Sequence, residues 1–292
     1  MNRPRTQDTY DRLAESDGDS SQNYYRHAGP DMRLKSMLAV VARLKPRTVL
    51  EIGCSDGHVM GSLKRALSGN RQAGIFGLDV SEISLQRARA KGCGQVVRAL
   101  AEDLPFRKNS FDLLIASQVL EHIPGLERAI GQAFSVLQPG GYFIITIPLA
   151  DWFKLYKGLL RRASVKFLDQ ETHVREWALV NFQGFVSKDR LLSQLRENGF
   201  IISQCQGAFF YSWRLERLAD RTFLKWPRTY EIIRAWDQIL GSIPALRWAA
   251  RYAIIVSQKP ESNIQKTNDL PARHRISDVF PGPGKDSGTK IS

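Results

Sequence analysis

The stretch VLEIGCSDG at Val49–Gly57 is the most informative part of this chain. A short apolar run that contains one acid, Thr48–Ile52, is followed by two glycines four residues apart. This pattern predicts a buried strand that runs into a tight turn. Because Gly53 and Gly57 carry no side chain, the backbone of that turn can come close to a ligand.

An acidic residue at the end of the next predicted strand narrows the choice of ligand. Gly74–Val80 reads GIFGLDV, and its Asp79 stands 22 residues after Gly57. In Rossmann-like folds a carboxylate at this place hydrogen-bonds a ribose diol. The glycines follow G-x-x-x-G and not G-x-G-x-x-G, so the turn offers no evident cradle for a pyrophosphate. These features predict a nucleoside without a phosphate chain. A carboxylate that caps the following helix is the alternative interpretation of Asp79.

Three further blocks follow these two in order. The complete set is EIGCSDG at 51–57, GLDVS at 77–81, AEDLPFRKNSFDLLIAS at 101–117, LEHI at 120–123 and LQPGGYFIITIP at 137–148. With these blocks, over roughly residues 47–148, the chain resembles the class I S-adenosylmethionine-dependent methyltransferases of the small-molecule type. The resemblance implies a Rossmann-like fold and S-adenosylmethionine as the cofactor.

The resemblance assigns cofactor-binding roles to residues at the ends of the predicted strands. Glu51 faces the amino group of the methionine moiety, and Asp79 binds the ribose hydroxyls. Ser117 and Gln118 lie beside the methionine, although polar residues at the end of a strand would look the same. The predicted cofactor set is Glu51, Gly53, Cys54, Ser55, Gly57, Asp79, Val80, Ala101, Glu102, Ser117 and Gln118.

The adenine end of the site departs from the family pattern. Relatives often have an aspartate where this chain has Leu100, so the adenine would rely on the backbone near Ala101 and Glu102. The carboxylate of Glu102 or Asp103 is the candidate substitute for the missing aspartate. Leu78 and Val80 are expected to flank the adenosine.

Methyl transfer from a sulfonium mainly requires alignment of the nucleophile and exclusion of water. A hydroxyl acceptor would also benefit from a base. His122 of LEHI is the best placed of the five histidines, and related O-methyltransferases carry the same Glu-His pair. The alternative is that this pair starts the next helix. His173, in THVREW, is the second candidate for a substrate contact or base.

Composition bounds the class of protein. The chain has 292 residues, no apolar run near the ~18 that a membrane-spanning helix needs, and a polar start that is no signal peptide. Its three cysteines show no metal-type spacing and indicate reduced thiols in a cytoplasmic protein. A net charge of +13 favours anionic partners. Nucleic acid ranks last among them, because no nucleic-acid module is visible.

Alternating strand and helix patterns predict an α/β fold. We expect a Rossmann-like, seven-stranded, mostly parallel sheet with helices on both faces. Residues 1–30 are expected to form a flexible N-terminal arm, 31–260 the methyltransferase domain and 261–292 a disordered tail. The seventh strand, Tyr252–Ser257, should be antiparallel, as in the family it resembles. Helical insertions are predicted after strands five and six, at about 151–180 and 209–250.

The two insertions are basic and amphipathic. In 151–168 an aromatic and leucine-rich face opposes a Lys/Arg face, and in 213–228 arginines and lysines recur at steps of three and four. Such helices suit an anionic membrane surface, where apolar residues enter the headgroup boundary and cations meet lipid phosphate. A lid with a solvated basic face is the alternative.

The sequence thus predicts a cytoplasmic methyltransferase, peripheral on the inner membrane face in the interfacial interpretation. Its expected acceptor is small and hydrophobic or lipid-linked, with oxygen favoured as the accepting atom. Two alternatives stay open: a soluble sugar or secondary-metabolite methyltransferase with a helical lid, and a non-catalytic S-adenosylmethionine-binding protein. The acceptor and the oligomeric state do not follow from the sequence.

Overall fold

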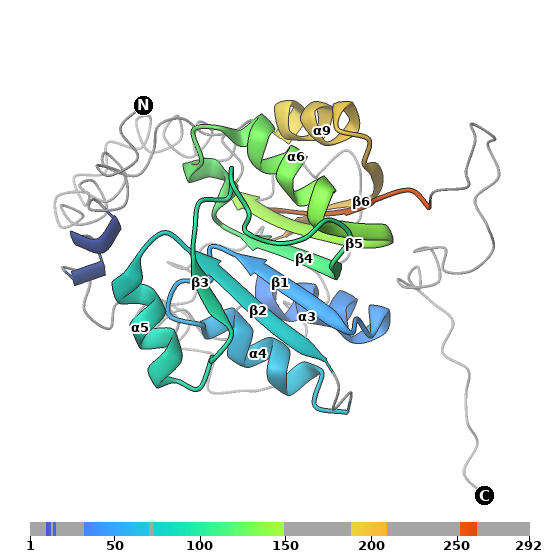
Figure 1. Ribbon diagram of the computed structural model, residues 1–292. Helices are drawn as coiled ribbons and strands as arrows, with labels where there is room; N and C mark the ends of the chain where they lie inside the picture. Colours follow the sequence, from blue (N-terminus) through green and yellow to red (C-terminus); the bar gives the residue numbers. More distant parts are fainter. Residues whose placement is uncertain are drawn as a thin grey trace, which may run out of the picture.

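The computed structural model describes residues 10–12, 14–15, 32–69, 73–148, 188–208 and 252–261 (Figure 1). The insertions predicted at 151–180 and 209–250 lie outside the described residues, as do the predicted tail after 261 and most of the predicted arm. Among the described residues no helix is both long and apolar enough to span a membrane.

The described strands form one seven-stranded sheet in the order β3-β2-β1-β4-β5-β7-β6. The five strands from β3 to β5 pair in parallel, and β7 pairs antiparallel with both β5 and β6. This confirms the predicted mostly parallel sheet and the antiparallel seventh strand. The strands are β1 (Thr48–Ile52), β2 (Gly74–Asp79), β3 (Val96–Arg98), β4 (Phe111–Ser117), β5 (Leu137–Pro148), β6 (Ile201–Ala208) and β7 (Tyr252–Gln258).

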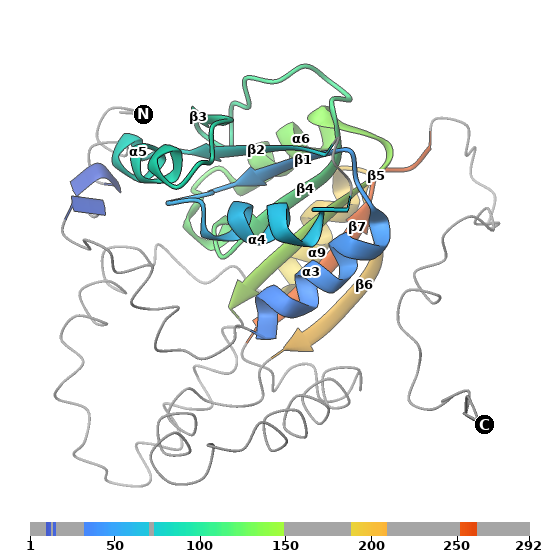
Figure 2. The same ribbon diagram turned by 90° about the horizontal axis from the view of Figure 1, so that it is seen from below.

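Helices cover both faces of the sheet, as predicted. Figures 1 and 2 show α3, α4 and α5 on one face and α6 and α9 on the other. This two-sided cover explains why β1, β4 and β5 read as continuous apolar runs, since both of their faces are buried. The helices are α3 (Met32–Leu44), α4 (His58–Ala66), α5 (Glu82–Ala90), α6 (Leu126–Val136) and α9 (Lys188–Glu197), with a short 3-10 helix, η1 (Leu120–His122).

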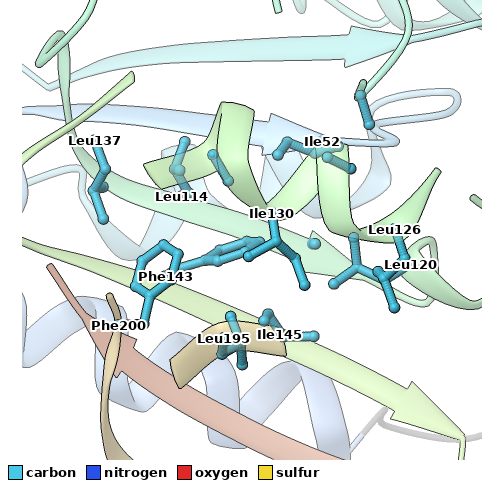
Figure 3. Close-up of a cluster of buried hydrophobic side chains, with 14 of the residues drawn as sticks. Ile52, Leu114, Leu120, Leu126, Ile130, Leu137, Phe143, Ile145, Leu195 and Phe200 are labelled. Carbon is cyan, nitrogen blue, oxygen red and sulfur yellow. The ribbon is translucent and has the colours of Figure 1, made fainter. Parts of the chain in front are cut away.

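Each face has its own hydrophobic core. Between the sheet and α6 and α9, the Phe143 ring lies 5.8 Å from that of Phe200, which also meets Phe134 edge-on at 5.1 Å. Figure 3 shows Ile130 and Leu195 reaching into this layer from the two helices. On the opposite face, Met37, Val41 and Leu63 of α3 and α4 pack against β1, β4 and β5, among other residues.

Polar contacts set the register at the ends of strands. The Asp112 carboxylate accepts the backbone N–H groups of Arg47 and Thr48 at 2.8 and 3.0 Å, which aligns the start of β1 with β4. After β7, the Lys259 ammonium donates to the carbonyls of Phe134 and Leu137 at 2.8 Å each. These carbonyls lie at the end of α6, where the helix itself supplies no donor.

Two boundaries differ from the sequence-based expectation. The apolar run YFIITI predicts a strand that begins at Tyr142, after the turn at Gly140 and Gly141. β5 instead begins at Leu137, because Leu137 already pairs with Phe111 before a shift of register. Part of the expected loose arm is also ordered, since residues 10–12 and 14–15 are helical and lie against the start of α5 (Figures 1 and 2, dark blue).

Candidate functional site

The predicted site residues converge on the carboxyl edge of the sheet. β1 lies between β2 and β4, so the strand order reverses beside β1, where the chain returns from β3 to begin the other half of the sheet at β4. In open α/β sheets, ligands bind outside the carboxyl ends of the strands at such a switch point. The loops after β1, β2 and β4 begin at Gly53, Val80 and Gln118, and all of them open on this edge.

The loop after β1 is held by β2. The N–H groups of Gly53 and Cys54 both donate to the Leu78 carbonyl, at 2.7 and 2.9 Å. Gly53 and Gly57 have φ of +73° and +81°, in the left-handed region that favours glycine. The sequence pattern identified the turn correctly through these two glycines.

The structure gives these glycines a reason besides ligand approach. A Cβ on Gly53 would lie 2.5 Å from Cγ2 of Val119, and one on Gly57 would lie 2.7 Å from Sγ of Cys93. A side chain at either position would therefore meet this chain's own residues before it met a ligand.

Asp79 is fixed by two backbone donors. Its Oδ2 accepts the N–H of Ser55 at 2.8 Å, and its Oδ1 accepts that of Ser81 at 2.9 Å. The α5 cap is Ser81, whose hydroxyl accepts the N–H of Ser84, so Asp79 is not the helix cap. Each carboxylate oxygen keeps acceptor capacity for a ligand hydroxyl. Burial raises the pKa of Asp79, although its backbone donors oppose that shift.

Glu51 is the clearest sign of a missing partner. It is buried at the end of β1 with 2% of its surface exposed, and its Oε2 has no hydrogen-bond partner. Burial, with smaller contributions from the charges of Asp79 and Asp56, raises its pKa well above the ordinary value. An unpaired buried carboxylate is costly. A ligand ammonium at this atom would satisfy it, so the site fits the methionine end of S-adenosylmethionine.

The polar residues after β4 are tied to β5. Ser117 Oγ lies 3.2 Å from Oγ1 of the buried Thr146, and the Gln118 N–H donates to the Thr146 carbonyl at 2.9 Å. Gln118 has φ of +57°, an uncommon conformation for a residue other than glycine. Their predicted place beside the methionine stays a prediction, and their structural role is to join β4 to β5.

The other predicted cofactor residues differ in what they present. Cys54 packs its buried side chain against Met60 and Leu85, so only its backbone borders the site. Leu78 is 1% exposed in the core, so its side chain does not flank a ligand as expected. Val80 accepts a hydrogen bond from Arg98 at its carbonyl.

The adenine end of the predicted site lies near the start of α6. Ala101 is buried in the core on that face of the sheet. Glu102 is only half-buried, and its side chain packs so closely on Gly125 that a Cβ there would lie 2.9 Å from its Cγ. The side chain of Glu102 can therefore accept a hydrogen bond from a ligand, whereas Ala101 can contribute only its backbone.

Glu121 and His122 lie after β4 at the same edge of the sheet. They belong to η1 and not to α6, which begins at Leu126 beyond Pro124, so the pair does not start the next helix. Glu121 Oε1 lies 4.0 Å from His122 Nε2, while its Oε2 has no hydrogen-bond partner. Burial raises the pKa of Glu121 to about 7, against the opposing charge of Arg33. His173 lies outside the described residues.

Sequence reasoning missed three contributors to this edge. Thr146 is the one aliphatic hydroxyl in the run YFIITIP, and that contrast with its apolar neighbours could have identified it. Gly77 has no room for a side chain, because a Cβ would lie 2.6 Å from Sδ of Met60. Asp11 reaches Ser81 across 70 positions of sequence, for which no local pattern gives a signal.

Comparison with known proteins agrees with this geometry. Residues 50–145 match the family described as "Methyltransferase domain", which implies S-adenosylmethionine as the cofactor. The chain is 34% identical to squalene methyltransferase 2 of Botryococcus braunii over 40% of this chain and 32% of that protein. It is 32% identical to the mitochondrial arginine-hydroxylase NDUFAF5 of Danio rerio over 43% of this chain and 38% of that protein.

A longer match has lower identity. The chain is 23% identical to the ubiquinone biosynthesis O-methyltransferase of Bordetella avium over 62% of this chain and 73% of that protein. By contrast, it spans only about a third of the length of the first curated relatives that it matches.

Replacing Asp79 by alanine should weaken binding of S-adenosylmethionine and S-adenosylhomocysteine. Loss of a charge-assisted contact to the ribose costs roughly 1.5–3 kcal/mol, or about ten- to a hundredfold in affinity. Calorimetry on the purified chain measures this. Glu82→Ala, which removes an acid three residues further on that pairs with Arg89, is the matched control and should leave affinity unchanged. Equal affinity in Asp79→Ala and the parent would contradict the prediction that Asp79 binds the ribose hydroxyls.

Glu121 should make stability depend on pH. Its folded pKa of about 7 lies above the ordinary 4.5, so the folded state holds the proton more tightly. Stability from this group is therefore present below pH 4.5 and is lost as pH rises towards 7, by on the order of 2–3 kcal/mol. Replacing Glu121 by glutamine, which cannot ionise, should remove this pH dependence.

Urea denaturation tests this. The free energy of unfolding of Glu121→Gln, relative to the parent, should increase between pH 5 and pH 8. Glu127→Gln, at an exposed acid in the first turn of α6, is the control and should show the same small difference at both pH values. A difference for Glu121→Gln that does not change with pH would contradict the burial argument.

Proposed function

We propose that this chain, whose residues 50–145 match the methyltransferase domain family, is an S-adenosylmethionine-dependent methyltransferase. Its proposed acceptor is small and hydrophobic or lipid-linked, with oxygen as the favoured accepting atom. The observation that carries the proposal is the buried Glu51, whose Oε2 lacks a partner, next to β2, the strand that ends in Asp79. The Glu51 carboxylate can bind a cation, and the Asp79 carboxylate can accept hydrogen bonds from hydroxyls.

Residues of three loops would hold the cofactor. Glu51 would bind the ammonium through its partnerless oxygen, and Asp79 would accept the ribose hydroxyls. The backbone of Gly53–Gly57, fixed by the Leu78 carbonyl, would line the nucleoside. When bound, S-adenosylmethionine supplies a methyl group on a positively charged sulfur, which is already an activated leaving group.

The remaining work of the protein is alignment, desolvation and proton removal. His122 would take the proton of an acceptor hydroxyl. Glu121, 4.0 Å from His122 Nε2, would stabilise the imidazolium that results once its own carboxyl is ionised. Because burial sets the pKa of Glu121 at about 7, this support would increase as the pH rises through neutrality.

The hydrophobic acceptor is supported by the relatives and by the charge pattern. Two of them are named for squalene methylation and for O-methylation in ubiquinone biosynthesis. The basic amphipathic segments predicted at 151–168 and 213–228, which lie outside the described residues, would bring the enzyme to an anionic membrane surface. A cytoplasmic protein that is peripheral on the inner membrane face is part of the same proposal.

Three alternatives make different predictions. A soluble sugar or secondary-metabolite methyltransferase would use the two segments as a lid. A non-catalytic protein would bind S-adenosylmethionine without transfer. The relative named as an arginine-hydroxylase means that the domain alone does not decide the reaction.

Labelling of a cell extract separates these alternatives. The purified chain is incubated with methyl-labelled S-adenosylmethionine and extract, which is then divided into lipid and aqueous fractions. We expect label in the lipid fraction, and less of it with Asp79→Ala when the S-adenosylmethionine concentration is below that needed to saturate the variant. Label in soluble metabolites alone would favour the lid alternative, and binding without transfer would favour the non-catalytic one.

His122→Ala tests the base. If His122 takes the proton, turnover should fall by about a hundredfold or more while cofactor affinity stays nearly the same, since the imidazole is not assigned to the cofactor. A fall of under about threefold would mean that alignment alone drives transfer. The two readouts are initial rate and calorimetric affinity on one preparation.

A further inference from the structure

A segment near the start of the chain contacts the loop after β2, beside the candidate cofactor site. Residues 10–12 are helical and are placed against the N-terminus of α5, as both views show in dark blue (Figures 1 and 2). Asp11 makes this contact. Its Oδ1 accepts the hydroxyl of Ser81 at 2.8 Å and the N–H of Ile83 at 3.4 Å, and its Oδ2 pairs with Arg98 at 2.8 Å.

The residues that hold Asp11 also hold the ribose carboxylate. Ser81 donates its N–H to Asp79 Oδ1 and its hydroxyl to Asp11 Oδ1. Arg98 is the register partner of Asp79 on β3, and its Nε donates to the Val80 carbonyl at 2.9 Å. The Asp11 contacts therefore converge on the loop that follows β2, the same loop that would receive the ribose.

Tyr10 extends this contact across the site. It is half-buried, and the carboxylates that act on it are Asp79 of β2, Glu102 of the loop after β3 and Glu121 of η1. Burial, followed by these three charges, raises the pKa of the Tyr10 phenol. The three acids lie on three separate elements around the candidate site, so the Tyr10 phenol lies within electrostatic range of all three.

We propose that Tyr10 and Asp11 form a clasp on the cofactor site, in which Asp11 anchors the segment to Ser81 and Arg98 and Tyr10 covers the bound nucleoside. The proposal rests on the proposed function, since it takes S-adenosylmethionine and S-adenosylhomocysteine as the ligands. Neither residue belongs to the five sequence blocks or to the matched region at 50–145.

The segment is held weakly enough to detach from the site and return to it. A helix of this length is not stable alone, so its order depends on the contacts of Asp11 and Tyr10. The ion pair that anchors it is partly exposed, with 34% of the Arg98 side chain and 22% of the Asp11 side chain accessible. Exposed pairs contribute little to stability, so local opening is easy and does not require the sheet to unfold.

The loss of the Asp11 charge and the loss of the Asp11 anchor predict opposite changes in ligand affinity for the Asp11→Ala variant. The Asp11 charge is one of the causes that raise the pKa of Asp79, so its removal alone would make Asp79 a better acceptor and strengthen binding. Loss of the anchor would release Tyr10 and weaken binding. S-adenosylhomocysteine is the suitable probe, because it lacks the sulfonium charge and so reduces the direct attraction of Asp11 for a cationic ligand.

The test measures affinity and dissociation rate of S-adenosylhomocysteine on the full chain. Asp11→Ala and Tyr10→Ala should each raise the dissociation rate constant about fivefold or more and weaken affinity. The double variant should be no worse than about twofold beyond the poorer single variant, since both remove one clasp. Glu15→Ala, at an exposed acid on the same segment, is the matched control and should behave as the parent.

The outcomes separate the clasp from the proposed function. If the parent binds and the Asp11→Ala and Tyr10→Ala rates stay within twofold of it, the clasp is wrong and the methyltransferase proposal stands. An equal loss in Glu15→Ala would also overturn the clasp. If the parent does not bind, the cofactor assignment and the clasp fall together. Thermal unfolding midpoints equal to that of the parent, measured without ligand, show that the variants fold. If Asp11→Ala does not fold, the dissociation rate of Tyr10→Ala alone tests the clasp.

Discussion

One carbonyl oxygen, that of Leu78, holds the candidate site in shape. It accepts the N–H groups of both Gly53 and Cys54, and so ties the loop after β1 to the residue just before Asp79. The Ser55 N–H then reaches the Asp79 carboxylate from the same loop. Glu51 and Asp79 are thereby kept on neighbouring strand ends with their loops fixed, and α4 and α5 begin directly after those loops.

The edge that this loop forms holds two buried acids, Glu51 and Glu121, and the half-buried Asp79. Burial raises the pKa of Glu51, Asp79 and Glu121, and two of the three keep a carboxylate oxygen without a hydrogen-bond partner. Folding alone gains nothing from such groups, because desolvation of a carboxylate opposes folding. Perturbed acids gathered at one edge are typical of functional sites. A cationic ligand would offset part of this cost.

The acidic site contrasts with the basic chain around it. The net charge of +13 attracts anions over the whole molecule, whereas the carboxylates at the sheet edge favour a cation close by. Long-range and short-range electrostatics thus select different molecules. The combination supports the proposal of a cationic cofactor at the sheet edge and an acceptor at an anionic surface.

The sequence by itself determined the sheet and the place of the site. Apolar runs such as Thr48–Ile52 and YFIITI, the two glycines and Asp79 are local signals, because strand burial, positive φ and a strand-end carboxylate each depend on neighbouring residues. The antiparallel seventh strand was expected from the family resemblance, and the structure confirms it.

Only the tertiary structure decided what each side chain contacts. It showed that Val119 and Cys93 leave no room for side chains at Gly53 and Gly57, that Leu78 points into the core, and that Ser117 and Gln118 join β4 to β5. It also brought Asp11 to Ser81 and Arg98. These contacts join residues far apart in the chain, and their free energy depends on how close folding brings them, which no local pattern of residue types records.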